Sequence, residues 1–126
     1  QQAAKHGIWL VGGTIPMLAS VDNKIRAACL LYDDTGKLAA RYDKIHLFDV
    51  SVMDSDESYT ESETIEAGDQ AVVVDTPFGK LGLAVCYDLR FPELYRALVE
   101  REARWLMVPS AFARSSKPPT TWASKP

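Results

Sequence analysis

The sequence predicts an α/β protein, in the form of an α+β sandwich, from three observations. Short apolar runs separated by turn residues predict several β-strands, and one stretch with apolar residues at helical spacing predicts a single helix. This helix lies between two predicted strands, in the order of a crossover unit over a sheet. The 126 residues, 47% of them hydrophobic, suffice for one modest domain. A single helix cannot cover all these strands, so we expect an open sheet face and a sandwich that is only partly contained in the chain.

The N-terminal part predicts one strand followed by a hairpin. Residues 8–11 (Ile-Trp-Leu-Val) form a compact apolar run, which we expect the glycine pair at residues 12–13 to end. Residues Ile25–Tyr32 predict a second strand. The turn sequence Asp-Asp-Thr-Gly at 33–36 connects it to a returning strand at 37–42, so this region predicts a β-hairpin.

The middle of the chain predicts a long loop and a second hairpin. Residues 49–70 are rich in Asp, Glu, Ser and Thr and have no clear period, which is typical of a functional or disordered loop. Residues 71–75 and 80–85 predict two strands, and the turn sequence Thr-Pro-Phe-Gly at 76–79 joins them.

A helix is predicted from Pro92 onward. Proline suits the first turn of a helix, and Glu93 complements the positive end of the helix dipole. Five apolar residues then fall on one helical stripe: Phe91, Leu94, Tyr95, Leu98 and Val99. Residues 105–108 predict a further strand, which Pro109 ends. Residues 114–126 are rich in Ser, Pro, Thr and Lys and predict an irregular or foreign tail, so we place the domain at residues 1–113.

The composition excludes several classes of function. The net charge of −3 and the interspersed charges argue against a nucleic-acid partner, and the longest apolar run is too short to span a membrane. The chain opens without a recognisable signal peptide, and its two cysteines, Cys29 and Cys86, lie far apart. We therefore expect free thiols in a reducing, cytoplasmic compartment. No Cys/His spacing predicts a metal site.

Cys86 is the first candidate for chemistry, because it ends an apolar strand and precedes a helix by a few residues. A nucleophile at such a turn is exposed at the sheet edge, where the following backbone N–H groups face a developing oxyanion. From position alone, a buried structural cysteine is the better hypothesis, since free cysteines are among the most buried residues. Cys29, in mid-strand, is expected in the core.

Three polar residues are further candidates. Lys44 ends a predicted strand, and a lysine in such a position is ordinarily expected on the surface. Glu61 lies in the acidic loop, where a solvated charge is the ordinary expectation. His46 suits a catalytic base or a metal ligand, but the other histidine, His6, is far away. A hydrogen-bonded structural histidine is therefore favoured. Taken alone, these residues make a cysteine enzyme one hypothesis among others and support nothing more specific.

Two longer motifs extend this interpretation. The sequence Tyr-Asp-Lys-Ile-His-Leu-Phe-Asp-Val at residues 42–50 resembles the lysine motif of the nitrilase superfamily of carbon–nitrogen hydrolases. The sequence Gly-Leu-Ala-Val-Cys-Tyr-Asp-Leu-Arg-Phe-Pro-Glu-Leu at 82–94 resembles its cysteine motif. Both occur in the family's order and at about its separation. The chain is most similar to the Nit-type branch, which contains omega-amidases and deaminated glutathione amidases.

The resemblance implies a partial four-layer α-β-β-α sandwich and a Glu-Lys-Cys catalytic set without a metal or organic cofactor. Cys86 would attack a small carboxylate-bearing amide, with Lys44 and the Tyr87 backbone N–H beside the oxyanion. Ammonia would leave, and the thioester on Cys86 would be hydrolysed. Glu61 would orient Lys44 or the substrate. Because homo-oligomers are common in the family, we expect the full-length parent to form a homo-oligomer.

One catalytic residue of the family is missing from the sequence. The general-base glutamate of the family precedes the first strand, whereas this chain has no glutamate before Glu57. We therefore expect a fragment in which thioester hydrolysis is slowed about 10²–10⁴-fold. The alternatives are a nitrile-hydrolysing relative and a non-catalytic remnant that only associates with other subunits. An unrelated thiol protein is disfavoured, because no resolving cysteine lies near Cys86.

Overall fold

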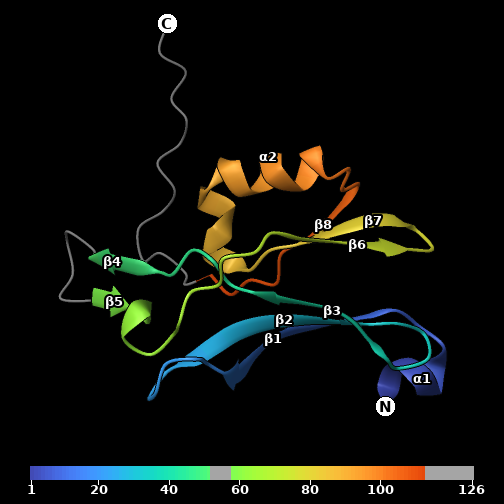
Figure 1. The fold of residues 1–126 in the computed structure, drawn as a ribbon, viewed down its shortest axis with the longest axis horizontal. Coiled ribbons are helices and arrows are strands. Elements are labelled where there is room, and N and C mark those ends of the chain that lie inside the picture. The colour runs from blue at the N-terminus through green and yellow to red at the C-terminus, as the bar shows by residue number, and fades with distance from the viewer. Residues whose placement is uncertain (52–57, 113–126) are drawn as a thin grey trace, which may run out of the picture.

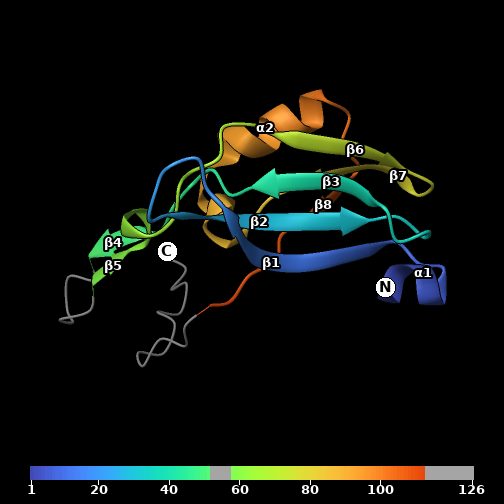
Figure 2. The same ribbon diagram turned by 60° about the horizontal axis from the view of Figure 1, so that its bottom comes forward.

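The computed structural model of the protein describes residues 1–51 and 58–112. The first sheet has the order β1-β2-β3, formed by β1 (Leu10–Leu18), β2 (Ile25–Tyr32) and β3 (Leu38–Asp43), and all its pairings are antiparallel. The predicted first hairpin is thereby confirmed. Figure 2 shows the three strands side by side.

The first strand differs from its prediction, because the glycine pair does not end it. β1 continues through Gly12 and Gly13 to Leu18, and its pairing with β2 shifts between Val11 and Thr14. Gly13 has a φ of 72°, which a glycine adopts without strain, so a bulge replaces the expected end of the strand. The short helix α1 (Gln2–His6) before this strand was not predicted.

The second sheet has the order β6-β7-β8. β6 (Val72–Thr76) and β7 (Gly79–Leu83) form the predicted antiparallel hairpin. β8 (Trp105–Met107) pairs with β7 in parallel, after the crossover helix α2 (Pro92–Glu100). The expected strand–helix–strand unit is therefore confirmed.

The predicted helix stripe is correct except at its last residue. Leu94 and Leu98 are buried, whereas Val99 is 59% exposed. A short 3₁₀ helix, η2 (Cys86–Arg90), precedes α2.

The long loop predicted at residues 49–70 is partly wrong. It contains a small antiparallel pair, β4 (Asp49–Ser51) with β5 (Ser58–Thr60), followed by the 3₁₀ helix η1 (Glu61–Glu63). The tail predicted at residues 114–126 lies outside the described residues.

The elements stack in layers, as expected for part of an α/β sandwich. Helix α2 covers the sheet β6-β7-β8, which lies over the sheet β1-β2-β3 (Figure 1). The core fills the space between them, and its buried residues are Cys29, Leu31, Tyr42, Leu81, Leu83, Ala84, Val85, Leu94 and Leu98.

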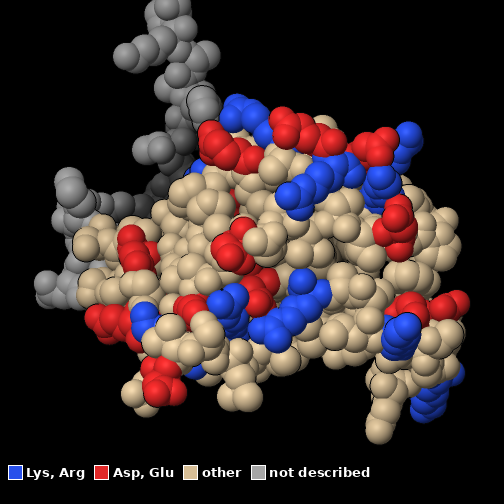
Figure 3. Space-filling model, in the orientation of Figure 1, with Lys and Arg blue, Asp and Glu red and all other residues tan. Residues whose placement is uncertain are grey.

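The other face of the first sheet has no helix over it within the described part of the chain, as predicted, and α1 lies at one end (Figures 1 and 2). Exposed apolar side chains of this sheet include Leu18 and Leu38. On the molecular face shown in Figure 3, acidic and basic side chains are interspersed. No helix among the described residues is long and apolar enough to cross a membrane.

Candidate active site

Lys44 lies directly after β3 and is held there by backbone hydrogen bonds. Its N–H donates to the Ala27 carbonyl (2.9 Å), and its carbonyl accepts from the Gly68 N–H (2.8 Å). A Cβ atom at Gly68 would lie 2.2 Å from the carbonyl oxygen of Asp43, so only glycine allows this close approach. Lys44 is just 4% exposed, in contrast to the ordinary expectation of a surface lysine.

Glu61 pairs with the buried lysine. Its Oε2 lies 2.6 Å from Lys44 Nζ and also accepts a hydrogen bond from the Phe48 N–H at 2.6 Å. The Glu61 N–H donates in return to the Phe48 carbonyl (3.3 Å). A buried ammonium needs such a partner, because an unpaired charge away from water is costly. Glu61 is therefore a docked counter-ion and not a solvated loop charge.

Cys86 lies at the turn from β7 into η2, as the sequence predicted. Its φ of 46° is in the left-handed region, which costs a non-glycine residue about 1–3 kcal/mol. The surroundings hold this conformation, since the Cys86 N–H donates to the Pro109 carbonyl at 3.0 Å. Its Sγ lies 3.8 Å from the Ala111 carbonyl oxygen. Unlike the buried Cys29, Cys86 is partly exposed, so the structural-cysteine alternative fits Cys29 and not Cys86.

The three predicted side chains meet at one pocket of about 400 Å³. Lys44 follows the end of β3, Glu61 begins η1 and Cys86 begins η2 just after β7, so the site lies where the two sheets and the 49–70 region converge. This volume suits a small-molecule ligand. The lining residues are Thr14, Ala27, Lys44, Glu61, Val85, Cys86, Pro109, Ser110 and Ala111.

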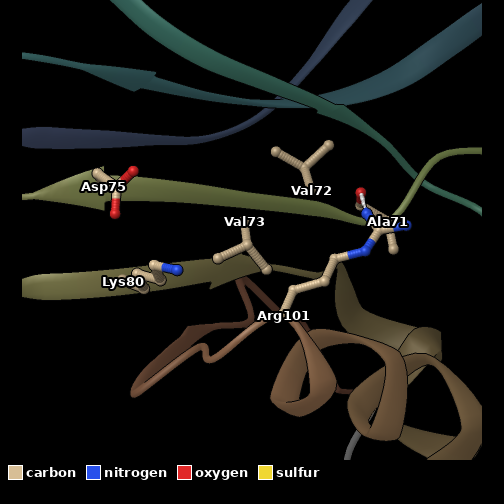
Figure 4. A pocket seen from close by; sticks show the side chains of 6 residues that line it. All are labelled: Ala71, Val72, Val73, Asp75, Lys80 and Arg101. Atoms are coloured by element: carbon tan, nitrogen blue, oxygen red, sulfur yellow. Dashed lines mark hydrogen bonds between the residues drawn. The ribbon is translucent and has the colours of Figure 1, made fainter.

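Another pocket, of about 330 Å³, lies at β6, β7 and the end of α2 (Figure 4). Its Arg101 guanidinium donates to the Ala71 carbonyl, and its Lys80 ammonium pairs with Glu102. Both cations are thus already engaged within the protein. None of the predicted catalytic side chains lines this pocket, whereas all three line the pocket at Cys86.

His46 has the structural role that the sequence favoured. Its Nδ1 lies 2.7 Å from Asp88 Oδ1, and its ring stacks on Phe91 with a centroid distance of 3.8 Å. In the part of the chain that the structure describes, no group of His, Cys, Asp and Glu is placed to hold a metal ion. Cys29 is buried in the core as expected, and burial raises the pKa of its thiol to about 11.

Asp88 is a buried residue of this region that the sequence patterns did not predict. An aspartate two residues after a candidate nucleophile suggests an exposed turn, yet this side chain is 0% exposed. The signal that could have found it is the long apolar run before Cys86, which places the whole turn against the core.

Similarity to known proteins agrees with this arrangement. The model of the carbon-nitrogen hydrolase family matches residues 1–125. The deaminated glutathione amidase of Yersinia enterocolitica is 44% identical over 115 residues, which cover 90% of this chain and 40% of that protein. The omega-amidase NIT3 of Saccharomyces cerevisiae is 42% identical over 110 residues, which cover 87% of this chain and 38% of that protein. The chain thus spans about 40% of the length of these curated relatives.

A solved structure shares the fold. A point mutant of the amidase of Nesterenkonia sp. AN1, which is from the nitrilase superfamily, superposes with a TM-score of 0.74 at 30% identity, over 90% of this chain and 40% of that one. That structure shows covalent addition of the acetamide moiety of fluoroacetamide at the active-site cysteine. The fold, the two sequence motifs and the family match over nearly the whole chain lead to one assignment: the chain belongs to the carbon-nitrogen hydrolase family.

Proposed function

We propose that this chain carries the acyl-transfer centre of an amidase, with Cys86 as the nucleophile. The observation that supports this most directly is the convergence of Cys86, Lys44 and Glu61 on one pocket. The partly exposed thiol and the buried ammonium supply the two groups that such a reaction requires: an attacking sulfur and a fixed positive charge.

In the proposed reaction, Cys86 Sγ forms a bond to the carbonyl carbon of a small amide. The Lys44 ammonium stabilises the negative oxygen that develops, together with the Tyr87 N–H in the first turn of η2, where helices leave N–H groups without intrahelical partners. The C–N bond then breaks, and the nitrogen takes up the proton that the thiol gave up. It leaves as ammonia when the substrate is a primary amide, and as an amine when the substrate is a substituted amide such as deaminated glutathione. A thioester remains on Cys86.

Glu61 is proposed to orient Lys44 and not to attack or deliver water. Its Oε2 is already occupied by the Lys44 ammonium and the Phe48 N–H. Among the described residues that line the pocket, Glu61 is the single carboxylate, so we propose that hydrolysis of the thioester is slow in this chain. A base contributes about 10²–10⁴-fold to such a step.

The substrates we propose are small carboxylate-bearing amides, including deaminated glutathione and α-keto-acid amides. The similarity to a deaminated glutathione amidase and an omega-amidase supports this choice. The two free cysteines support a reducing, cytoplasmic setting. We also propose that the protein forms a homo-oligomer and has no nucleic-acid or membrane partner.

The test is a burst experiment on the purified chain. With a primary α-keto-acid amide as the substrate, we expect about one equivalent of ammonia per chain, followed by little turnover. Mass spectrometry should show the acyl adduct on the peptide that contains Cys86. Cys86→Ala should abolish the adduct, and Lys44→Met should slow its formation about 10²–10³-fold. Lys37→Met, at an exposed turn position, is the matched control and should behave as the wild type.

Three other outcomes are informative. Absence of ammonia and of any adduct would refute the proposal and leave the non-catalytic remnant. Steady turnover would refute the slow hydrolysis step alone. A matched nitrile that acylates Cys86 faster than the amide would favour the nitrile-hydrolysing alternative.

A further inference from the structure

A buried carboxylate links the two segments that carry the site. Asp88 is 0% exposed, and both of its oxygens accept hydrogen bonds. Oδ1 accepts from the His46 N–H (3.0 Å) and lies 2.7 Å from His46 Nδ1, whereas Oδ2 accepts from the Tyr42 hydroxyl (2.7 Å) and the Val85 N–H (2.8 Å). A carboxylate only accepts hydrogen bonds, so His46 Nδ1 carries the proton in this pair.

These donors flank the reacting groups in the sequence. Tyr42 and His46 lie two residues before and two residues after Lys44, and Val85 directly precedes Cys86. Asp88 therefore connects the Lys44 segment to the Cys86 turn through one side chain.

The donors are themselves fixed in place. Tyr42 is fully buried, and burial, with the hydrogen bond to Asp88, raises the pKa of its hydroxyl, which stays protonated and donates. The Tyr42 hydroxyl also accepts from the Ile45 N–H at 3.2 Å. The His46 ring is stacked on Phe91 with an interplanar angle of 9°, which sets the direction of its Nδ1–H.

The same carboxylate closes the turn around Cys86. The Val85 N–H donates to Asp88 Oδ2, and the Asp88 N–H donates back to the Val85 carbonyl at 3.0 Å. Cys86 lies inside this reciprocal pair with its unfavourable φ of 46°. A backbone conformation of this kind persists only where neighbouring contacts determine it.

We propose that Asp88 is a positioning residue that fixes the Cys86 thiol relative to the Lys44 ammonium. This inference rests on the proposed function, because it assigns Asp88 to that reaction without direct contact with the substrate. A displacement of about 1 Å between reacting groups costs about 10²-fold in rate, so we expect the loss of the bridge to slow Cys86 chemistry.

The test measures the rate of Cys86 alkylation by iodoacetamide at pH 7, followed peptide by peptide with mass spectrometry. Cys29 serves as an internal monitor of folding, because it is fully buried and reacts only when the core opens. We expect Asp88→Asn to slow Cys86 alkylation at least about tenfold, while Cys29 stays protected.

A matched pair at His46 separates hydrogen bonding from packing. In His46→Asn, the side-chain amide nitrogen takes the place of Nδ1 and keeps the donor to Asp88, whereas His46→Leu keeps a similar bulk without a donor. We expect His46→Asn to stay within about threefold of the wild type and His46→Leu to be slowed about tenfold. If Asp88→Asn exposes Cys29 to the reagent, the comparison of the two His46 variants still tests the positioning role of Asp88.

Each result has a definite meaning. Cys86 that reacts at the wild-type rate in Asp88→Asn, with Cys29 protected, would overturn the positioning role and leave the proposed function intact. Equal rates of Cys86 alkylation in the two His46 variants would also overturn the positioning role and leave the proposed function intact. A wild-type Cys86 no faster than a free cysteine would overturn both this inference and the catalytic assignment of Cys86.

Discussion

Removing the positive charge of Lys44 should destabilise the protein by leaving Glu61 without its partner. Their side chains are 5% and 24% exposed, and the ionic atoms are 2.6 Å apart. Breaking a buried pair by removing one partner costs about 3–5 kcal/mol. Glu61 keeps the hydrogen bond from the Phe48 N–H and some contact with solvent, so we expect about 3 kcal/mol for Lys44→Met.

The double variant Lys44→Met/Glu61→Gln should recover most of this loss. Glu61→Gln alone strands the more deeply buried ammonium and should cost at least about 3 kcal/mol. In the double variant no charge is left unpaired, and the glutamine oxygen can still accept from Phe48. We therefore expect a cost of about 1–2 kcal/mol, far below the sum of the single changes.

Urea denaturation followed by tryptophan fluorescence at pH 7 gives the four free energies of unfolding. Lys37→Met, on an exposed turn, is the control and should lie within about 0.5 kcal/mol of the wild type. A Lys44→Met protein as stable as this control would refute the reasoning. Strict additivity of the two single changes would also refute it, because it would mean that the pair contributes nothing.

Two further predictions concern the close backbone approach at Gly68 and the ion pair between Arg26 and Glu66. Gly68→Ala would place a Cβ 2.2 Å from the Asp43 carbonyl oxygen and should lower the free energy of unfolding by about 2–4 kcal/mol, whereas Gly12→Ala, with its nearest contact at 3.6 Å, is the control and should cost about 1 kcal/mol or less. A small effect of Gly68→Ala in urea denaturation would contradict the close approach. The hydrogen bond from Arg26 is the largest cause that lowers the pKa of Glu66, from 4.5 to about 2. A depressed carboxylate pKa stabilises the fold above the unfolded value, so the melting-temperature advantage over Glu66→Gln should persist down to about pH 4.5 and shrink toward pH 2. An advantage undiminished at pH 2 would speak against this salt bridge.

The elements that could be predicted from the sequence combine a mainly apolar pattern with clear turn residues at an end. The strand Ile25–Tyr32 has the predicted bounds, because its run of apolar residues ends at a clear turn. The continuation of β1 beyond Gly13 was missed, because the same glycine pair is compatible either with the end of a strand or with a bulge inside it. β4 and β5 were missed, because each has three residues of which two are polar, so neither forms an apolar run like that of the equally short β8.

The candidate site could be predicted only in part. Resemblance to a family located Cys86, Lys44 and Glu61, and the structure brings all three to one pocket. The four hydrogen bonds of Asp88 could not be predicted, because they join residues up to 46 positions apart and depend on how the two sheets pack.

The composition of the pocket also has a consequence for the order of folding. Its residues extend from Thr14 to Ala111, so its walls meet only through contacts that are distant in the sequence. Such contacts form late, because long segments of chain must be ordered before they can be made. The β6-β7 hairpin joins neighbouring residues and can form early. During refolding, the thiol of Cys86 should therefore acquire its native alkylation rate last, and its reactivity marks the completion of the tertiary structure.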